Sequence, residues 1–204
     1  MLTIEEVAGM AKEQIPDRAG ALTPEDISFL VGLLEEKDDI LRYHALLLLQ
    51  NRSELFSDVY PFWDILVEKF KSTNSYHRSI GLMLIADNVR WDTTCKFDPI
   101  LEDFLAMVDD EKPVTVRQCV QSLCKIVPYK SHLIPRITEK LMSVDLSSRK
   151  ETQQKILLLD ILSVLAVTRR YVEDGKVETY IMNALTGALL DKKAKAGIEK
   201  LMKD

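Results

Sequence analysis

The 204-residue sequence has few of the features that mark strands, metal sites or catalytic loops. It contains only seven glycines, no Asn-Gly pair and no long alternating run of β-branched residues, which disfavours a β-rich fold. It has no Gly-rich phosphate loop and no GxSxG, HExxH or EF-hand motif. The three histidines, His44, His77 and His132, do not fall at metal-ligand spacing. We therefore expect no catalytic residues, no bound metal and no cofactor.

Cysteine is also scarce, because only Cys95, Cys119 and Cys124 occur and no two of them form a CxxC pair. An odd, sparse set of cysteines indicates reduced thiols. The N-terminus lacks the basic and apolar regions of a signal peptide. The most apolar stretch, Ile156 to Val167, contains Asp160 and is too short to cross a bilayer. These features predict a soluble, cytoplasmic protein without a membrane span.

The sequence also has no excess of positive charge, because its formal net charge is -5. This balance argues against a dedicated nucleic-acid binder. The charge is uneven: residues 1–40 carry ten acids and three bases, whereas residues 176–204 carry six bases and four acids. We interpret this as acidic solvated helices at one end and a lysine-rich cap at the other. A charged partner for either end is the alternative.

A repeat emerges from the prolines, four of which stand 37, 38 and 36 residues apart. These four are Pro24, Pro61, Pro99 and Pro135. The residues six and nine positions after each are apolar, a spacing that keeps them on one helix face. They are Leu30, Val67, Leu105 and Leu141, and then Leu33, Phe70, Val108 and Val144. Each proline therefore indicates the start of one amphipathic helix.

A second helix follows in each unit, beginning near a basic residue 17 to 20 positions after the proline. The basic residues are Arg42, Arg78, Arg117 and Lys155. Apolar or small residues follow three and six positions later: Ala45, Gly81, Val120 and Leu158, then Leu48, Leu84, Leu123 and Ile161. Thr3 with Glu6, and Ser148 with Glu151, have the spacing of capping boxes, which mark helix starts.

We interpret residues 1–204 as a single helical-repeat domain. Residues 1–21 hold an N-terminal helix (3–14) and a linker that includes Pro16, and residues 170–204 form C-terminal capping helices. Residues 22–169 form four helix pairs, 22–52, 58–90, 98–128 and 131–169. A polar, atypical terminal unit is what a helical stack needs to end without exposing its core.

The pattern resembles the HEAT and armadillo class of helical repeats. Asp39-Ile40-Leu41-Arg42 is similar to the Asp-x-Val-Arg signature of HEAT-like repeats, and Val114-Thr115-Val116-Arg117 keeps the valine and arginine. The resemblance implies an all-α fold, a right-handed α-α solenoid of about four to five helix pairs. In these families the aspartate and arginine form a ladder between repeats. The resemblance thus assigns structural inter-repeat roles to Asp39, Arg42, Arg78 and Arg117.

In solenoids of this kind the second helices usually line the concave face, which is the default binding surface. The sides of those helices away from the apolar register mix tyrosine, methionine, amides and scattered charge. This mixture favours a protein or peptide partner, because Tyr, Met and Arg are enriched at such interfaces. The candidate partner-binding residues are Tyr43, Leu47, Gln50, Ser79, Met83, Arg90, Gln118, Ser122 and Lys125. We therefore hypothesise that the chain is a non-enzymatic interaction or scaffold module. The sequence leaves its oligomeric state undetermined.

The alternative hypothesis is a nucleic-acid-processing protein, because some proteins resembling this class are DNA glycosylases for alkylated bases. Those proteins combine a strongly basic groove with aromatic and acidic residues at its centre. Trp63, Trp91, Asp87 and Arg90 would be the corresponding candidates. The acidic balance and the interspersed lysines and arginines oppose this, since phosphate contact needs clustered positive charge.

Overall fold

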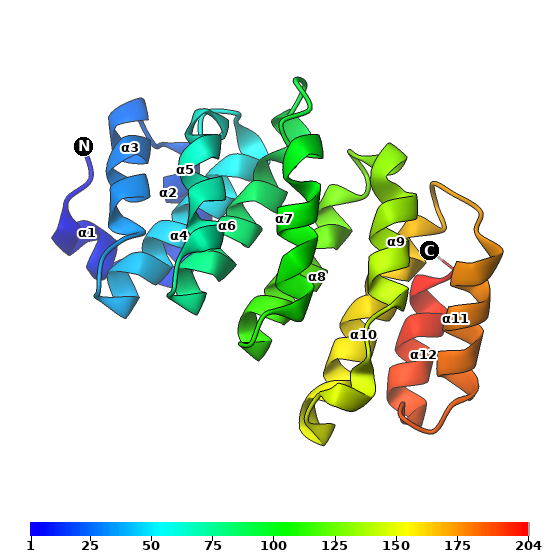
Figure 1. Cartoon of the computed structure of the whole chain (residues 1–204). Coiled ribbons are helices and arrows are strands. Elements are labelled where there is room, and N and C mark those ends of the chain that lie inside the picture. The colour runs from blue at the N-terminus through cyan, green and yellow to red at the C-terminus, as the bar shows by residue number, and fades with distance from the viewer. Residues whose placement is uncertain (204) are drawn as a thin grey trace. The chain divides into compact units, whose positions relative to one another are not determined.

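A computed structural model describes residues 1–203 (Figure 1). The described residues form helices and connections, with no strand among them. The chain divides into two compact units, residues 1–100 and residues 101–204, each with its own packed interior. The expected all-α fold built from helix pairs is confirmed.

The first unit contains six α-helices and several 3₁₀ turns within residues 1–100. The α-helices are α1 (Ile4–Ala8), α2 (Ile15–Gly20), α3 (Pro24–Leu33), α4 (Asp39–Leu55), α5 (Trp63–Glu68) and α6 (Ser75–Asn88). The 3₁₀ turns are η1 (Lys12–Gln14), η2 (Tyr60–Phe62), η3 (Lys69–Lys71), η4 (Val89–Trp91) and η5 (Asp98–Ile100). The long helix α4 packs against α2, α3 and α6, so the second helices of successive pairs lie side by side (Figure 1).

The second unit repeats this arrangement over residues 101–203. Its α-helices are α7 (Leu101–Ala106), α8 (Pro113–Ile126), α9 (Ile134–Met142), α10 (Glu151–Thr168), α11 (Gly175–Thr186) and α12 (Lys192–Leu201). Its 3₁₀ turns are η6 (Met107–Asp109), η7 (Ser131–Leu133) and η8 (Leu146–Ser148). Helix α10 packs against α8 on one side and α12 on the other, and α9 contacts both α10 and α11.

The apolar register explains why these helices pack as pairs. Leu48, Leu84, Leu123 and Ile161, which share one position of the second helices, are all fully buried. Each contributes about 1.5–3 kcal/mol by leaving water. At the matching position of the first helices Leu30, Leu105 and Leu141 are buried, and only Val67 is half-buried.

Two expectations about the N-terminal segment, the extent of its helix and a linker at Pro16, are wrong. The N-terminal helix stops at Ala8, where the Gly9 N–H bonds the Glu5 carbonyl (2.9 Å), because glycine is a poor helix former. The chain then forms α2, and Pro16 stands in its first turn rather than in a linker. The capping box of Thr3 and Glu6 is confirmed.

The expected capping box of Ser148 and Glu151 does not form. Asp145 instead organises a separate 3₁₀ turn by accepting a hydrogen bond from the Ser147 N–H (2.9 Å), and the Ser148 hydroxyl donates to the Asp145 carbonyl (2.7 Å). Helix α10 consequently begins after Lys150, whose side chain caps nothing. Within residues 1–203, no helix has the combined length and apolar character needed to traverse a lipid bilayer.

Candidate partner-binding surface

A ladder of polar contacts fixes α4 against α6 in the first unit. The Gln50 side-chain amide donates to the Asp87 carboxylate (2.8 Å), and the Asn88 amide donates to the Ser53 hydroxyl (2.9 Å). The indole N–H of Trp91 donates to the Ser53 carbonyl (2.8 Å). Asn88 and Ser53 are completely buried, so these hydrogen bonds offset the cost of removing the donor and acceptor atoms that form them from water. The two second helices are therefore held in one fixed register.

The candidate residues of the first unit lie at different depths around this ladder. Tyr43 is 43% exposed, whereas Leu47 and Met83 are half-buried. Ser79 was expected on the open side of α6 but is only 4% exposed, because its short side chain does not reach past its neighbours. Arg90 is exposed and donates to the Glu54 carbonyl (3.0 Å), which ties η4 to the end of α4.

Two exposed apolar residues that sequence reasoning missed extend this surface. Ile40 is 57% exposed and Tyr76 is 58% exposed, and both stand two residues before a signature arginine, in the first turns of α4 and α6. The Arg42 guanidinium lies 5.4 Å from the centre of the Tyr76 ring, so that ring spans two successive pairs. The Lys12 ammonium lies 5.1 Å from the centre of the Tyr43 ring. Ile40, Tyr43 and Tyr76 are hereafter called the aromatic surface.

In the second unit, the corresponding ladder joins α8 to α10. The Arg117 guanidinium donates to both oxygens of Asp160 (2.7 and 3.3 Å), and the Gln121 amide donates to one of them (2.9 Å). The hydrogen bond to Asp160 raises the pKa of Arg117. Of the candidate residues on α8, Gln118 is half-buried, Lys125 is exposed, and Ser122 is only 5% exposed although it was expected on the surface.

Asp39 and two of the signature arginines make contacts within their own helix pairs. Asp39, whose side chain is 84% exposed, pairs with Arg42 in its own helical turn. Arg42 donates to the Glu36 carbonyl (2.8 Å), and Arg78 donates to the Ser72 and Thr73 carbonyls (2.8 and 3.1 Å). These two arginines thus close the turn of their own pair. Of the implied set, Arg117 instead bonds a carboxylate on the next second helix.

A separate ionic contact connects the first two pairs. The buried Lys69 ammonium pairs with Glu35, and the His77 Nδ1 atom lies 3.4 Å from the other carboxylate oxygen of Glu35. The hydrogen bond from Lys69 lowers the pKa of Glu35, and burial lowers the pKa of His77. His77 is therefore neutral at pH 7, and the pair of Lys69 and Glu35 serves as a structural link.

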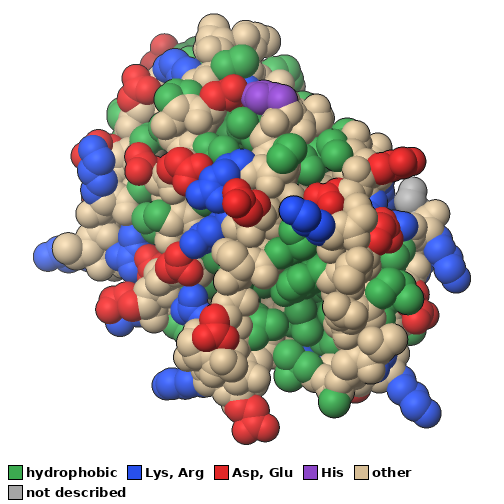
Figure 2. All heavy atoms as spheres, turned by 45° about the vertical axis from the view of Figure 1, so that its right-hand side comes forward, with side chains coloured by type: hydrophobic (Ala, Val, Ile, Leu, Met, Phe, Trp, Pro, Cys, Tyr) green, Lys and Arg blue, Asp and Glu red, His purple; other side chains and the backbone are tan. Residues whose placement is uncertain are grey.

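The residues that suggested DNA-base chemistry do not form an open site. Trp63 is 2% exposed in the interior of the first unit, and Asp87 is buried where it accepts the Gln50 amide. On the face drawn in Figure 2, lysine and arginine side chains alternate with aspartate and glutamate. Among residues 1–203, no three His, Cys, Asp or Glu side chains gather closely enough to hold a metal ion.

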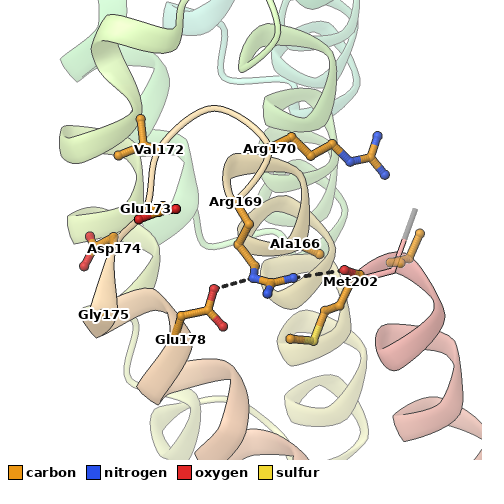
Figure 3. Close-up of a pocket in the computed structure, with 10 residues that line it drawn as sticks. Ala166, Arg169, Arg170, Val172, Glu173, Asp174, Gly175, Glu178 and Met202 are labelled. Carbon is orange, nitrogen blue, oxygen red and sulfur yellow. Dashed lines mark hydrogen bonds and ion pairs between the residues drawn. The ribbon is translucent and has the colours of Figure 1, made fainter.

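A cavity of about 540 Å³ lies at the end of the second unit, between the last turn of α10, the loop that follows it and the end of α12 (Figure 3). Arg169 points between α11 and α12, where it pairs with Glu178 and donates to the Met202 carbonyl (3.1 Å). The Arg170 side chain points away from Arg169, Glu178 and Met202 (Figure 3). Glu173 and Asp174 add negative charge to the wall. Arg169 thus ties the last three helices together, and the mixed charge selects no single class of ligand.

The solved structures with a similar fold include two designed armadillo repeat proteins and a third engineered protein. One is a designed armadillo repeat protein, with a TM-score of 0.62 and 14% identity, covering 98% of this chain and 89% of that chain. Another is described as a computationally designed armadillo repeat protein for modular peptide recognition, with a TM-score of 0.61, 13% identity, and coverage of 98% and 89%. A third, titled an engineered protein, has a TM-score of 0.57, 16% identity, and coverage of 98% and 86%.

The chain has an armadillo/HEAT-like helical repeat fold. This confirms the family resemblance and the all-α solenoid class expected from the prolines and arginines. No family model and no curated protein matches the chain. At identities of 13–16% the likeness to these structures establishes the fold, and function has to be argued from the surface.

Proposed function

We propose that this armadillo/HEAT-like chain is a non-enzymatic interaction module that holds a protein or peptide partner on the open side of its second helices. The aromatic surface of Ile40, Tyr43 and Tyr76 is the observation that carries this proposal. Three large apolar side chains, each 43–58% exposed, lie within the first two turns of α4 and α6, two helices that pack against each other.

These side chains suit partner recognition energetically. An aromatic side chain can bury about 150–250 Å² and loses little conformational entropy on binding, because it has only two rotatable bonds. Their backbones belong to α4 and α6, two helices whose later turns are joined by the polar ladder, so little ordering is needed when a partner binds. Leu47 and Met83, about one and two helical turns after Tyr43 and Tyr76, are half-buried and add further apolar area to the same helices. We take this side of the second helices to be the concave face.

The resemblance to a designed armadillo repeat protein for modular peptide recognition supports the same proposal. Its description says that it was computationally designed for modular peptide recognition. A surface of second helices with exposed aromatic residues is compatible with such use.

The test compares one surface variant with a matched control. The surface variant carries Tyr43→Ser and Tyr76→Ser, and the control carries Tyr171→Ser and Met182→Ser, which are also exposed (45% and 51%) but lie in the second unit. Proteins captured from native lysate by the unaltered chain are identified by mass spectrometry. Each candidate is then purified, and its affinity for all three forms is measured by titration calorimetry.

We expect the surface variant to bind at least about tenfold more weakly, because each lost aromatic contact is worth about 1–2 kcal/mol. The control should keep the affinity of the unaltered chain. Equal affinity for all three forms, or loss in the control alone, would refute the assignment of this surface.

A further inference from the structure

The uneven distribution of charge along the chain has no part in the aromatic surface. Residues 1–40 carry ten acids and three bases, and residues 176–204 carry six bases and four acids. In the first unit, α1 lies beside α4 at the end remote from α6 (Figure 1). In the second unit, α12 packs on the side of α10 opposite α8. Each charged segment therefore lies outside the polar ladders that join the second helices.

Helix α12 exposes a lysine-rich face. Ile198 is 3% exposed and is the buried residue of this helix, which packs against α10. Because successive residues of a helix are rotated by about 100°, Lys193, Ala196 and Lys200 lie opposite Ile198. Lys192 lies beside them, and all four of these outward residues are exposed. Lys192, Lys193 and Lys200 are hereafter called the basic face.

The positive charge of the basic face is not neutralised by its surroundings. None of its three lysines has an ion-pair partner within residues 1–203. The neighbouring acid Asp191 is already paired with Lys155. Lys195 donates to the Gly187 carbonyl (2.8 Å), and Glu199 is the single acid of the helix. Helix α12 thus carries four lysines against one glutamate.

The N-terminal helices expose acids in the same way. Both α1 and α2 pack against α4. On α1, Glu5 stands on the side opposite the buried Val7, and on α2, Asp17 stands on the side opposite the buried Ile15. Glu13, in the turn before α2, is exposed as well. Glu5, Glu13 and Asp17 are hereafter called the acidic face.

The bases in this segment do not cancel the acidic face. Among the described residues, none of its three carboxylates has an ion-pair partner. The segment contains two bases, Lys12, whose ammonium lies 5.1 Å from the centre of the Tyr43 ring, and the half-buried Arg18. Glu6 and Glu25 are exposed here too, so residues 1–25 hold five acids against two bases.

Each face also has an exposed aliphatic side chain beside its charges. Ile4, next to Glu5, is 49% exposed, and Leu201, next to Lys200, is 37% exposed. A contact between the two faces would bury apolar area together with opposite charges. Exposed ion pairs contribute little individually and are screened by salt. Such a contact is consequently weak and sensitive to ionic strength.

We propose that the basic face of α12 docks on the acidic face of α1 and α2 in a second copy of this chain. One chain supplies both complementary surfaces, and a head-to-tail contact of this kind lets copies join in series. Helix α12 has no aromatic ring for stacking on bases, and the centre of its basic face has no large apolar residue to enter lipid. A protein surface with its own carboxylates suits it better. This proposal does not depend on the aromatic surface.

The experiment measures sedimentation velocity of the full chain over a series of concentrations, at about 50 mM and about 500 mM salt. One variant reverses the basic face: Lys192→Glu, Lys193→Glu and Lys200→Glu. A second variant reverses the acidic face: Glu5→Lys, Glu13→Lys and Asp17→Lys. The matched control makes the same change in net charge as the first variant at three exposed lysines elsewhere: Lys71→Glu, Lys112→Glu and Lys150→Glu. Circular dichroism verifies that every variant remains folded.

The average mass of the unaltered chain should rise with concentration at low salt and return to that of the monomer at high salt. Each face variant alone should associate at least about tenfold more weakly, because like charges then face each other. An equimolar mixture of the two face variants should associate again, since each supplies the intact face that the other lacks. The control should associate within about twofold of the unaltered chain.

A monomeric unaltered chain at every concentration in low salt would overturn the proposal. Association that survives reversal of either face, or a mixture of the two variants that stays monomeric, would overturn it as well. Binding of duplex DNA or anionic vesicles by the basic face without self-association would assign that face a different occupant and refute the second copy. The Tyr43→Ser and Tyr76→Ser variant should self-associate like the unaltered chain, which separates this outcome from that of the proposed function.

Discussion

Gly81 offers a sharp test of how closely the helices of one pair approach. It stands on α6 at the register position occupied by Ala45, Val120 and Leu158 in the other pairs. A Cβ atom added at Gly81 would lie 2.7 Å from the Leu66 carbonyl oxygen and 3.0 Å from the Lys69 Cβ. Both distances are far inside van der Waals contact, so Gly81→Ala has to push α6 away from α5.

The size of the effect follows from two opposing terms. Overpacking typically costs about 1–3 kcal/mol, and we expect the upper end because a backbone carbonyl cannot rotate aside as a side chain does. Alanine recovers about 1 kcal/mol of helix propensity. The free energy of unfolding should therefore fall by about 2 kcal/mol, which corresponds to a urea midpoint about 1 M lower.

Gly32→Ala is the matched control, since an added Cβ there meets nothing within 4 Å. It should raise the free energy of unfolding by about 0.5–1 kcal/mol through helix propensity alone. Trp63 and Trp91 both belong to the unit of residues 1–100, so tryptophan fluorescence during urea unfolding reports on this unit. A Gly81→Ala midpoint at or above that of the unaltered chain would refute the reasoning.

Three further predictions concern single side chains. Cys95 is exposed and should react with an aromatic disulfide reagent at once, whereas burial raises the pKa of Cys119 and should delay its reaction until unfolding. Fast modification of Cys119 in the folded chain, located by peptide mass spectrometry, would contradict this. Asn88→Ala should lower the free energy of unfolding by about 1–2 kcal/mol, because it removes the donor to the buried Ser53 hydroxyl, while the loss of the buried Asn88 Oδ1, which accepts no hydrogen bond, offsets part of the cost; a urea midpoint within error of the unaltered chain would be inconsistent with the ladder. Burial alone would raise the pKa of Asp26, but hydrogen bonds from backbone N–H groups outweigh it and lower that pKa. Its carboxylate therefore stabilises the fold above its unfolded pKa of about 3.9, and this stability is lost as the pH falls through the lower folded value. Asp26→Asn should flatten the dependence of the urea midpoint on pH in that acidic range, and an unchanged slope would show that other carboxyl groups dominate.

The helix pairs could be predicted because their signals are local. Each first helix starts near a proline, and each second helix places apolar residues three positions apart, so spacing along the chain is enough. The break after Ala8 was missed because glycine in a helical pattern is often tolerated. Ser148 was misassigned because Asp145, three residues earlier, competes for the same turn.

Exposure on the second helices was harder to predict, since it depends on how each helix is rotated against its neighbours. Ser79 and Ser122 have polar side chains and were expected on the surface, but both are short enough to be covered. Ile40 and Tyr76 are apolar and outside the buried register, and they are exposed. The apolar register identifies the buried side of each helix, but it does not predict the exposed fraction of the side chains at the other positions.

The arginines show why one sequence position can have different roles. Arg42 and Arg78 donate to carbonyls of the turn that precedes them, six residues earlier in each pair. In the third pair, Arg149 from the following repeat occupies the equivalent turn by donating to the Val108 and Asp110 carbonyls. Arg117 pairs instead with Asp160 on α10.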